Sequence, residues 1–259
     1  MIELQGVTKI FRPRHGDPVR ALEDVTLAVE ENEFVSLVGP SGCGKSTLLK
    51  LVAGLVLATS GSVRVRGREV REPYPDAGFV FQSAVLLPWR TVLDNVLFSI
   101  EMLGLPARAH LERAAALIEL AGLAGFERKY PWELSGGMQQ RVAICRALVH
   151  DPGLLLMDEP FGALDALTRE EMSLELLRIW DERRKTILFV THSIPEAILL
   201  SDRVVVMTPR PGRLARVLDI DLPRPRRVDM EFDDRFKAYS DEIRRLIGTR
   251  IADTATRHG

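Results

Sequence analysis

The sequence predicts an α/β protein that has a mostly parallel sheet, a small antiparallel β-subdomain at the N-terminus and an inserted α-helical subdomain. Continuous apolar runs, typical of strands buried on both faces, occur at residues 34–38, 154–157, 187–190 and 204–207. Helical patterns separate these runs, as in parallel sheets, where ligands bind at the carboxyl ends of the strands. Residues 2–10 and 21–29 alternate between apolar and polar side chains, which indicates antiparallel strands.

The remaining elements follow along the chain. Residues 62–70 are typical of an exposed strand pair, and residues 78–81 of a short buried strand. Residues 91–125 have helical spacing only and are interrupted at Gly104 and Pro106, which predicts two helices of a helical subdomain. Further helices are expected at residues 138–149, at residues 167–184, from about residue 195, and in an apolar stripe that begins at Phe232.

Composition excludes several classes of protein. Hydrophobic residues make up 46% of the chain and charged residues 27%, with a formal net charge of −1, so bulk charge does not favour binding to nucleic acid. Two cysteines, Cys43 and Cys145, are too few for a disulfide framework. The N-terminus has no secretory signal pattern, and the longest apolar run, residues 48–58, contains Lys50 and is too short to span a bilayer core of about 30 Å.

A glycine-rich segment follows the first buried run and matches the pattern G-x-x-x-x-G-K-[ST]. Glycines allow backbone N–H groups to surround a phosphate, and the helix that follows adds its positive dipole. Lys45 supplies a cation for the β- and γ-phosphates, and the Ser46 hydroxyl is a ligand for Mg²⁺. The phosphate-binding residues are expected to be Gly39, Pro40, Ser41, Gly42, Cys43, Gly44, Lys45, Ser46 and Thr47. This motif predicts a P-loop NTPase (RecA-like) core.

Two carboxylates end the next buried run. Asp158 is expected to hold Mg²⁺ beside the phosphate loop, and Glu159 to polarise the attacking water. A further motif, LSGGMQQR at residues 134–141, opens a helix. Ser135 is a natural N-cap, and Gly136 and Gly137 leave backbone N–H groups open, so the sequence predicts a second anion site.

LSGGMQQR resembles the signature of the ATP-binding-cassette (ABC) ATPases, and the resemblance extends from about Ile2 to Leu222. It implies that two copies pack head to tail as a homodimer, with the phosphate loop of one copy and the signature of the other closing on the same ATP. It also implies roles for single residues. Gln82 resembles the glutamine that contacts Mg²⁺ and water, and Phe11 the aromatic residue that stacks on adenine. Asp165 resembles the aspartate at the dimer seam, and His192 the histidine that contacts the γ-phosphate.

The segments LLPWRTVLDNV, YPWELSGGMQQRVAICRAL and DEPFGALDALTR are similar to the nitrate/sulfonate/taurine importer branch of that family. This similarity implies a peripheral ATPase subunit at the cytoplasmic face of the inner (plasma) membrane. Its expected partners are permease subunits and a periplasmic or extracellular substrate-binding protein, with no nucleic acid. The transported substrate stays open. The alternative is a soluble, non-transport ABC ATPase that acts on nucleic acid or ribosomes.

The expected ATPase domain covers residues 1–222, with the core and β-subdomain at 1–88 and 150–222, the helical subdomain at 89–149, and a C-terminal helical tail at 223–259. We expect Leu87 and Trp89 to dock a permease helix, although Trp89 could instead be buried in the helical subdomain. The tail either packs on the chain's own core or forms a regulatory or partner-binding element. We also expect Cys43, inside the phosphate loop, to make the ATPase sensitive to alkylation.

Overall fold

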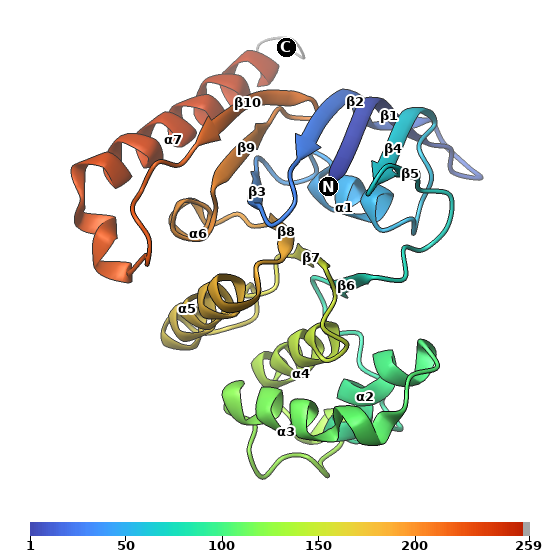
Figure 1. Ribbon diagram of the computed structural model, residues 1–259. Coiled ribbons are helices and arrows are strands. Elements are labelled where there is room, and N and C mark those ends of the chain that lie inside the picture. The colour runs from blue at the N-terminus through green and yellow to red at the C-terminus, as the bar shows by residue number, and fades with distance from the viewer. Residues whose placement is uncertain (256–259) are drawn as a thin grey trace. The chain divides into compact units, whose positions relative to one another are not determined.

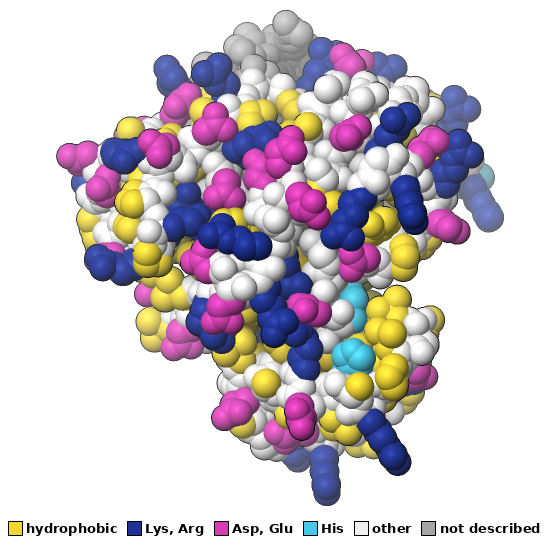
Figure 2. All heavy atoms as spheres, in the orientation of Figure 1, with side chains coloured by type: hydrophobic (Ala, Val, Ile, Leu, Met, Phe, Trp, Pro, Cys, Tyr) yellow, Lys and Arg dark blue, Asp and Glu magenta, His cyan; other side chains and the backbone are white. Residues whose placement is uncertain are grey.

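The computed structural model describes the backbone of residues 1–255 and the side chains of residues 1–248. This part of the chain divides into two compact units (Figure 1). Unit 1 comprises Met1–Tyr74 and the chain from Ile179 onward, and unit 2 comprises Pro75–Arg178. Lys and Arg side chains lie interspersed with Asp and Glu side chains over the face that Figure 2 shows.

Unit 1 begins with an antiparallel sheet in the strand order β2-β1-β4-β5. These strands are β1 (Ile2–Phe11), β2 (Val19–Val29), β4 (Ser60–Val65) and β5 (Arg68–Glu69). Apolar side chains at alternate positions of β1, such as Ile2 and Leu4, are buried while Glu3 between them is exposed. This burial follows from the two-residue period of a strand, which places alternate side chains on opposite faces.

The second set of strands in unit 1 runs in the order β10-β9-β3-β8. β3 (Phe34–Val38) pairs in parallel with β8 (Thr186–Val190) and with β9 (Arg203–Met207), and β10 (Leu214–Asp219) pairs antiparallel with β9. Every residue of β3 and β8 is buried. Such burial explains why these strands are nearly continuous apolar runs in the sequence.

The helices of unit 1 are α1 (Lys45–Val52), α6 (Ile194–Leu200), the 3-10 helix η3 (Val228–Phe232) and α7 (Asp234–Ala255). Phe236 and Ile243 are buried where α7 packs against α6, η3 and β9. The tail therefore packs on the chain's own core, as one of the two interpretations predicted. Phe232 is an exception, because 80% of it is exposed. Residues 256–259 of the tail lie outside the described part.

Arg226 joins the tail to the rest of unit 1. Its buried guanidinium donates hydrogen bonds to the carbonyl oxygens of Ile198, Leu199, Ser201 and Ile220, over distances of 2.5 to 3.2 Å. Burial lowers the pKa of Arg226 to about 10, so the side chain stays charged at neutral pH. One cation thus satisfies the carbonyl groups at the end of α6 and after β10.

Unit 2 contains two parallel strands, β6 (Ala77–Val80) and β7 (Leu154–Asp158), and a group of helices. The helices are α2 (Val92–Met102), η1 (Ala107–His110), α3 (Leu111–Leu120), η2 (Pro131–Glu133), α4 (Gly136–Leu148) and α5 (Ala166–Arg183), the last of which continues into unit 1. Side chains from α2, α3 and α4, among them Val96, Ile118 and Val142, form one buried cluster.

The predicted fold class is confirmed: a mostly parallel P-loop NTPase core, an N-terminal antiparallel sheet and a helical subdomain inserted in the chain. Between residues 1 and 255, no helix has both the length and the apolar character that a membrane span requires.

Candidate active site

The phosphate loop lies between β3 and α1 in unit 1. Gly44 is the N-cap of α1 and has a φ of 101°, a conformation that favours glycine. A Cβ at this position would lie 2.6 Å from Leu22 Cδ2 and 2.9 Å from the Ala21 carbonyl oxygen. Only glycine therefore fits where the loop turns into the helix. No side chain caps α1, so its first backbone N–H groups are available to an anion.

Lys45, the first residue of α1, directs its ammonium group back over this loop. Lys45 Nζ donates hydrogen bonds to the carbonyl oxygens of Gly39 at 2.8 Å and Pro40 at 3.1 Å. The side chain is 7% exposed. The loop thus concentrates a cation and a helix N-terminus in one place, which is an arrangement suited to several phosphate charges.

The surroundings of Cys43 bear on the predicted sensitivity to alkylation. The side chain is buried, and burial is the main cause that raises the pKa of its thiol, although Lys45 nearby opposes this shift. Thiolates react with alkylating agents and neutral thiols do not, so both the burial and the raised pKa slow the reaction. The prediction from sequence rested on the position of Cys43 in the phosphate loop, and the burial of the sulfur argues against it.

His192 follows β8 at the same edge of the sheet as the phosphate loop. Leu37 of β3 pairs with Val190 of β8, and the Thr191 N–H donates to the Leu37 carbonyl oxygen at 3.3 Å. Thr191 also fixes the turn, since its hydroxyl donates to Glu196 at 2.6 Å and accepts from the Ser193 N–H at 2.9 Å. The His192 side chain is exposed. The parallel register thus brings His192 and the phosphate loop to one edge of unit 1.

Phe11 is the last residue of β1 and pairs with Val19 of β2. The residue is 40% exposed. Lys9 Nζ lies 5.0 Å from the ring centroid. Phe11 therefore presents an aromatic surface on the antiparallel sheet of unit 1, and Lys9 is a neighbour that the sequence motifs did not indicate.

Unit 2 brings Gln82 and Glu159 together. β6 and β7 run in parallel with Val80 opposite Met157, so the residues that follow both strands emerge at the same edge. Gln82 Nε2 donates a hydrogen bond to Glu159 Oε2 at 3.3 Å. Asp158, at the end of β7, is only 4% exposed. Glu159 has a φ of 46°, a strained conformation for a residue other than glycine, and strain of this kind is concentrated at functional sites.

The signature segment forms the N-terminus of α4. Ser135 is the N-cap, as predicted, and its hydroxyl accepts a hydrogen bond from the Met138 N–H at 3.3 Å. Ser135 and Gly136 are exposed, and a Cβ added to Gly136 would meet nothing within 4 Å. A Cβ on Gly137 would lie 3.3 Å from Leu164. The helix N-terminus therefore opens to solvent on the side of Gly136 and packs on the side of Gly137.

Asp165 precedes α5 and binds Thr168. Its carboxylate accepts from the Thr168 N–H at 3.0 Å and from the Thr168 hydroxyl at 2.7 Å. The Thr168 N–H is the main cause that lowers the pKa of Asp165, so this side chain stays ionised at neutral pH. The structure gives Asp165 a local role at the start of the helix.

Two contacts beside the signature were not found from the sequence. The Gln140 side chain is buried and donates to the Phe81 carbonyl oxygen at 3.0 Å, which links α4 to the strand that leads to Gln82. The rings of Tyr130 and Trp132 are stacked, with centroids 4.6 Å apart. The sequence signal that could have revealed the Gln140 contact was a polar residue among the apolar positions of a helix.

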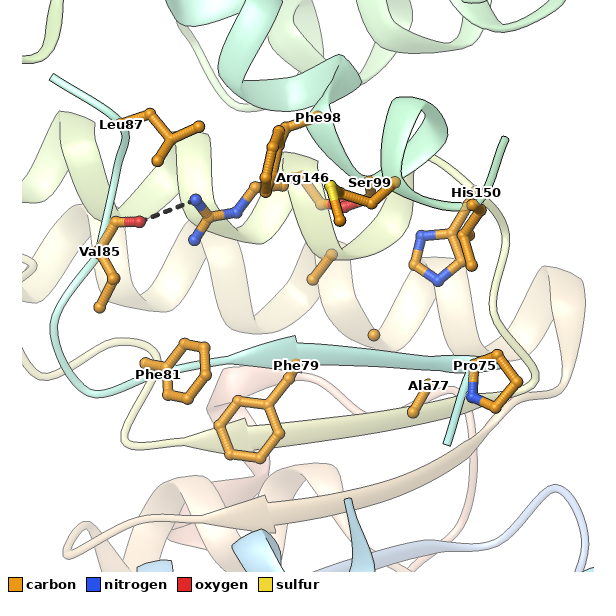
Figure 3. Close-up of a pocket in the computed structure, with 14 residues that line it drawn as sticks. Pro75, Ala77, Phe79, Phe81, Val85, Leu87, Phe98, Ser99, Arg146 and His150 are labelled. Carbon is orange, nitrogen blue, oxygen red and sulfur yellow. Dashed lines mark hydrogen bonds between the residues drawn. The ribbon is translucent and has the colours of Figure 1, made fainter. Parts of the chain in front are cut away.

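An apolar cavity of about 400 Å³ lies within unit 2. Figure 3 shows side chains from β6, α2 and α4 around it, with Arg146 directed toward the loop that follows β6. Arg146 donates to the carbonyl oxygens of Val85 at 2.9 Å and Ala84 at 2.8 Å, which fixes this loop. Leu87 lines the cavity, whereas Trp89 is not among the lining residues. Trp89 is 70% exposed, so the alternative of a buried Trp89 is wrong.

Metal ligands are the remaining part of the site. Among the described residues, no group of three or more His, Cys, Asp or Glu side chains forms a cluster that could hold a metal. Mg²⁺ does not need such a cluster, because it is typically held by one or two carboxylates, phosphate oxygens and water. The oxygen donors expected here, at Ser46, Gln82 and Asp158, are of the kind that Mg²⁺ prefers.

The chain resembles known proteins over most of its length. The family model described as ABC transporter matches residues 22–162. A taurine import ATP-binding protein, TauB, of Rhizobium johnstonii is 47% identical, with 86% of each chain covered. An aliphatic sulfonates import ATP-binding protein, SsuB, of Bacillus cereus is 44% identical over 87% of this chain and 88% of that protein.

Among solved structures, a dimeric ATP-binding cassette in a post-hydrolysis state, bound to ADP and Pi, is similar to the chain with a TM-score of 0.78. The two are 33% identical, and the match covers 86% of this chain and all of the other. The likeness thus covers both the sequence motifs and the fold. The chain belongs to the ABC transporter family, and it is a cassette that binds and hydrolyses ATP.

Proposed function

We propose that this chain is the motor of an importer for taurine, another sulfonate or a related small anion. The observation that carries the ATPase part of this proposal is the phosphate loop, where Lys45 and the uncapped start of α1 converge. The names of the relatives favour import of sulfonates over the alternative of a soluble cassette acting on nucleic acid or ribosomes.

The proposed roles of the site residues follow from their chemistry. Backbone N–H groups of residues 39–47 hold the ATP phosphates, and Lys45 neutralises charge on the β- and γ-phosphates. Glu159 polarises the attacking water, and Gln82, which it contacts, helps to place that water. His192 contacts the γ-phosphate, and Phe11 stacks on adenine. Ser46, Gln82 and Asp158 would hold Mg²⁺, which supplies charge neutralisation at the phosphates when it is bound.

Pairing of two copies completes the proposed site. The start of α4, at Ser135, Gly136 and Gly137, offers backbone N–H groups to the γ-phosphate held by a second copy. Asp165 lies at the seam between the copies. The cassette to which the chain is similar is a dimer, which supports the pairing of two copies. Because the transition state spreads negative charge over several oxygens, the site is complete only when the two copies close, and hydrolysis favours their opening.

The apolar cavity of unit 2 is the proposed docking site for a short helix of the permease. Aromatic and aliphatic side chains, including Phe79, Phe98 and Met102, line it, and Val85 at its edge is 59% exposed. An apolar groove with an amphipathic helix is a common mode of recognition. A substrate-binding protein completes the importer, and the chain lies on the cytoplasmic face of the membrane. We further propose that residues 1–222 form the ATPase domain and residues 223–259 an accessory tail.

Transport by the reconstituted complex tests this proposal. The cassette, its permease and its binding protein are placed in proteoliposomes with ATP at the cassette side, and uptake of labelled taurine and of an alkanesulfonate is measured. We expect ATP-dependent uptake that ceases with Lys45→Ala. Co-purification with ribosomes or RNA, together with no stable permease complex, would contradict the importer and support the alternative.

A further inference from the structure

The end of strand β1 holds a cation against the exposed ring of Phe11. Lys9 and Phe11 are two residues apart on a strand, so their side chains emerge on the same face. Lys9 Nζ lies 5.0 Å from the centroid of the Phe11 ring, within the range of a cation–π interaction. Phe11 is 40% exposed, so a ligand has access to this residue.

The position of this cation is fixed by the neighbouring loop. Lys9 Nζ donates a hydrogen bond of 2.7 Å to the carbonyl oxygen of Leu57, which belongs to the segment before β4. The Thr59 side chain accepts from the Ile10 N–H at 3.0 Å, and the Thr59 N–H donates to the Thr8 carbonyl oxygen at 2.8 Å. These bonds hold the C-terminal part of β1 to the segment before β4, at the residues on both sides of Lys9.

We propose that Lys9 is a positioning residue for the adenine base, and that it acts through Phe11. The inference rests on the proposed role of Phe11. An ammonium group on one face of an aromatic ring draws electron density from that ring and prevents a base from stacking there. The purine therefore stacks on the opposite face of the ring. Lys9 determines how the base binds and has no contact with the reacting atoms.

The test compares Lys9→Met, which removes the charge and keeps the length, with Lys9→Arg, which keeps a cation that interacts with aromatic rings. Lys237→Met, which removes an exposed lysine from α7, is the matched control. We expect Lys9→Met to raise the KM for ATP by about two- to fivefold, because Phe11 loses an exposed cation–π contact of that size. The kcat is expected to change less than the KM. Lys9→Arg restores most of the affinity, and Lys237→Met leaves KM unchanged.

Two further measurements separate the possible causes. Binding of Mg²⁺-tripolyphosphate, which has no base, is expected to be equal for the wild type and Lys9→Met. A loss of tripolyphosphate affinity would overturn the inference, because Lys9 would then act on the phosphates. In a double-mutant cycle, Lys9→Met is expected to have little effect in a Phe11→Leu background.

The cycle also distinguishes failure of this inference from failure of the proposed function. If Phe11→Leu leaves the affinity for ATP unchanged, the stacking role of Phe11 is wrong. If Phe11→Leu weakens ATP binding and Lys9→Met does not, only the inference about Lys9 is overturned.

Discussion

Glu159 combines three properties that single out the residue as the proposed general base. It follows a buried strand, its backbone has a φ of 46°, and its carboxylate accepts a hydrogen bond from Gln82. The strained backbone aims the side chain, and the amide orients it. The sequence placed a carboxylate at this strand end. Its contact with Gln82 depends on the register between β6 and β7, which no local pattern encodes.

Glu159→Gln is expected to lower kcat by about 10²- to 10⁴-fold, because the amide cannot take a proton from the attacking water. ATP affinity, measured by equilibrium binding of a fluorescent ATP analogue, is expected to stay within about twofold, since the phosphate loop is unchanged. Glu171→Gln, an exposed change on α5, is the control. Full ATPase activity in Glu159→Gln would show that another group activates the water.

Cys43 offers a prediction about pH. Burial raises the pKa of this thiol above its ordinary value of 9.0, so the reactive thiolate is scarce at neutral pH. Alkylation of Cys43 by iodoacetamide is expected to be slower than in the urea-unfolded chain. The rate of this reaction is expected to rise about tenfold per pH unit beyond pH 9. Peptide mass spectrometry over a pH series follows the reaction.

Cys145 is an internal reference for this experiment, since burial raises its pKa to about 12. We expect it to react more slowly than Cys43 at every pH at which the protein stays folded. Alkylation of Cys43 at the same rate in the folded and unfolded chains at pH 7.5 would contradict the burial of its sulfur.

At the scale of elements, the sequence predicted buried strands better than it predicted surfaces. Fully buried strands such as β3 and β7 are continuous apolar runs, because both of their faces are covered. The cavity of unit 2 is different. Its lining comes from β6, α2, α4 and the loops beside them, so only the folded chain assembles it. Trp89 is only two residues from Leu87 in the sequence and yet does not line the cavity. Closeness in the sequence is therefore not enough to predict which side chains line it.

Val85→Asp tests the cavity as a permease docking site. Val85 is exposed and has a φ of 44°, which aspartate tolerates better than valine, so the fold is expected to be retained. A charge at the edge of an apolar groove disfavours an apolar helix. We expect at least a tenfold loss of affinity for the permease in detergent, with basal ATPase activity kept.

Leu105→Asp, which places the same charge at an exposed site outside the cavity, is the control for Val85→Asp. Equal affinities of both variants and the wild type for the permease would place the docking site elsewhere.

Arg226 makes the connection between α6, β10 and the tail testable. Arg226→Met removes a buried cation and leaves up to four carbonyl oxygens without their donor, which is expected to lower the free energy of unfolding by about 2–4 kcal/mol. The adjacent Arg227→Met removes an exposed side chain that pairs with Asp229, and we expect a change within about 0.5 kcal/mol. Urea unfolding of both variants gives the comparison, and equal stabilities would contradict the role of Arg226.

At the scale of the whole molecule, the proposed mechanism requires two copies of the chain to share each ATP. The phosphate loop and the signature each lie at a helix N-terminus, one in unit 1 and one in unit 2. Motifs predicted both sites because glycines at fixed spacing reveal backbone N–H groups that bind anions. Which copy supplies the second site is a property of the assembly and is not encoded in any local pattern.

Mixing two inactive variants measures this sharing directly. Lys45→Ala disables the phosphate loop, and Gly136→Asp places a carboxylate at the signature, where space around Gly136 leaves the fold undisturbed. Gly136→Asn is the uncharged control. If each site combines the loop of one copy with the signature of the other, a mixed pair has one intact site.

The steady-state ATPase rate of the equimolar mixture is therefore the decisive measurement. Half of the randomly formed pairs are mixed and each has one intact site of two, so we predict a rate of about a quarter of the wild type, far above either variant alone. A rate no higher than the mean of the two separate variants would show that two copies of this chain do not complete each ATPase site together.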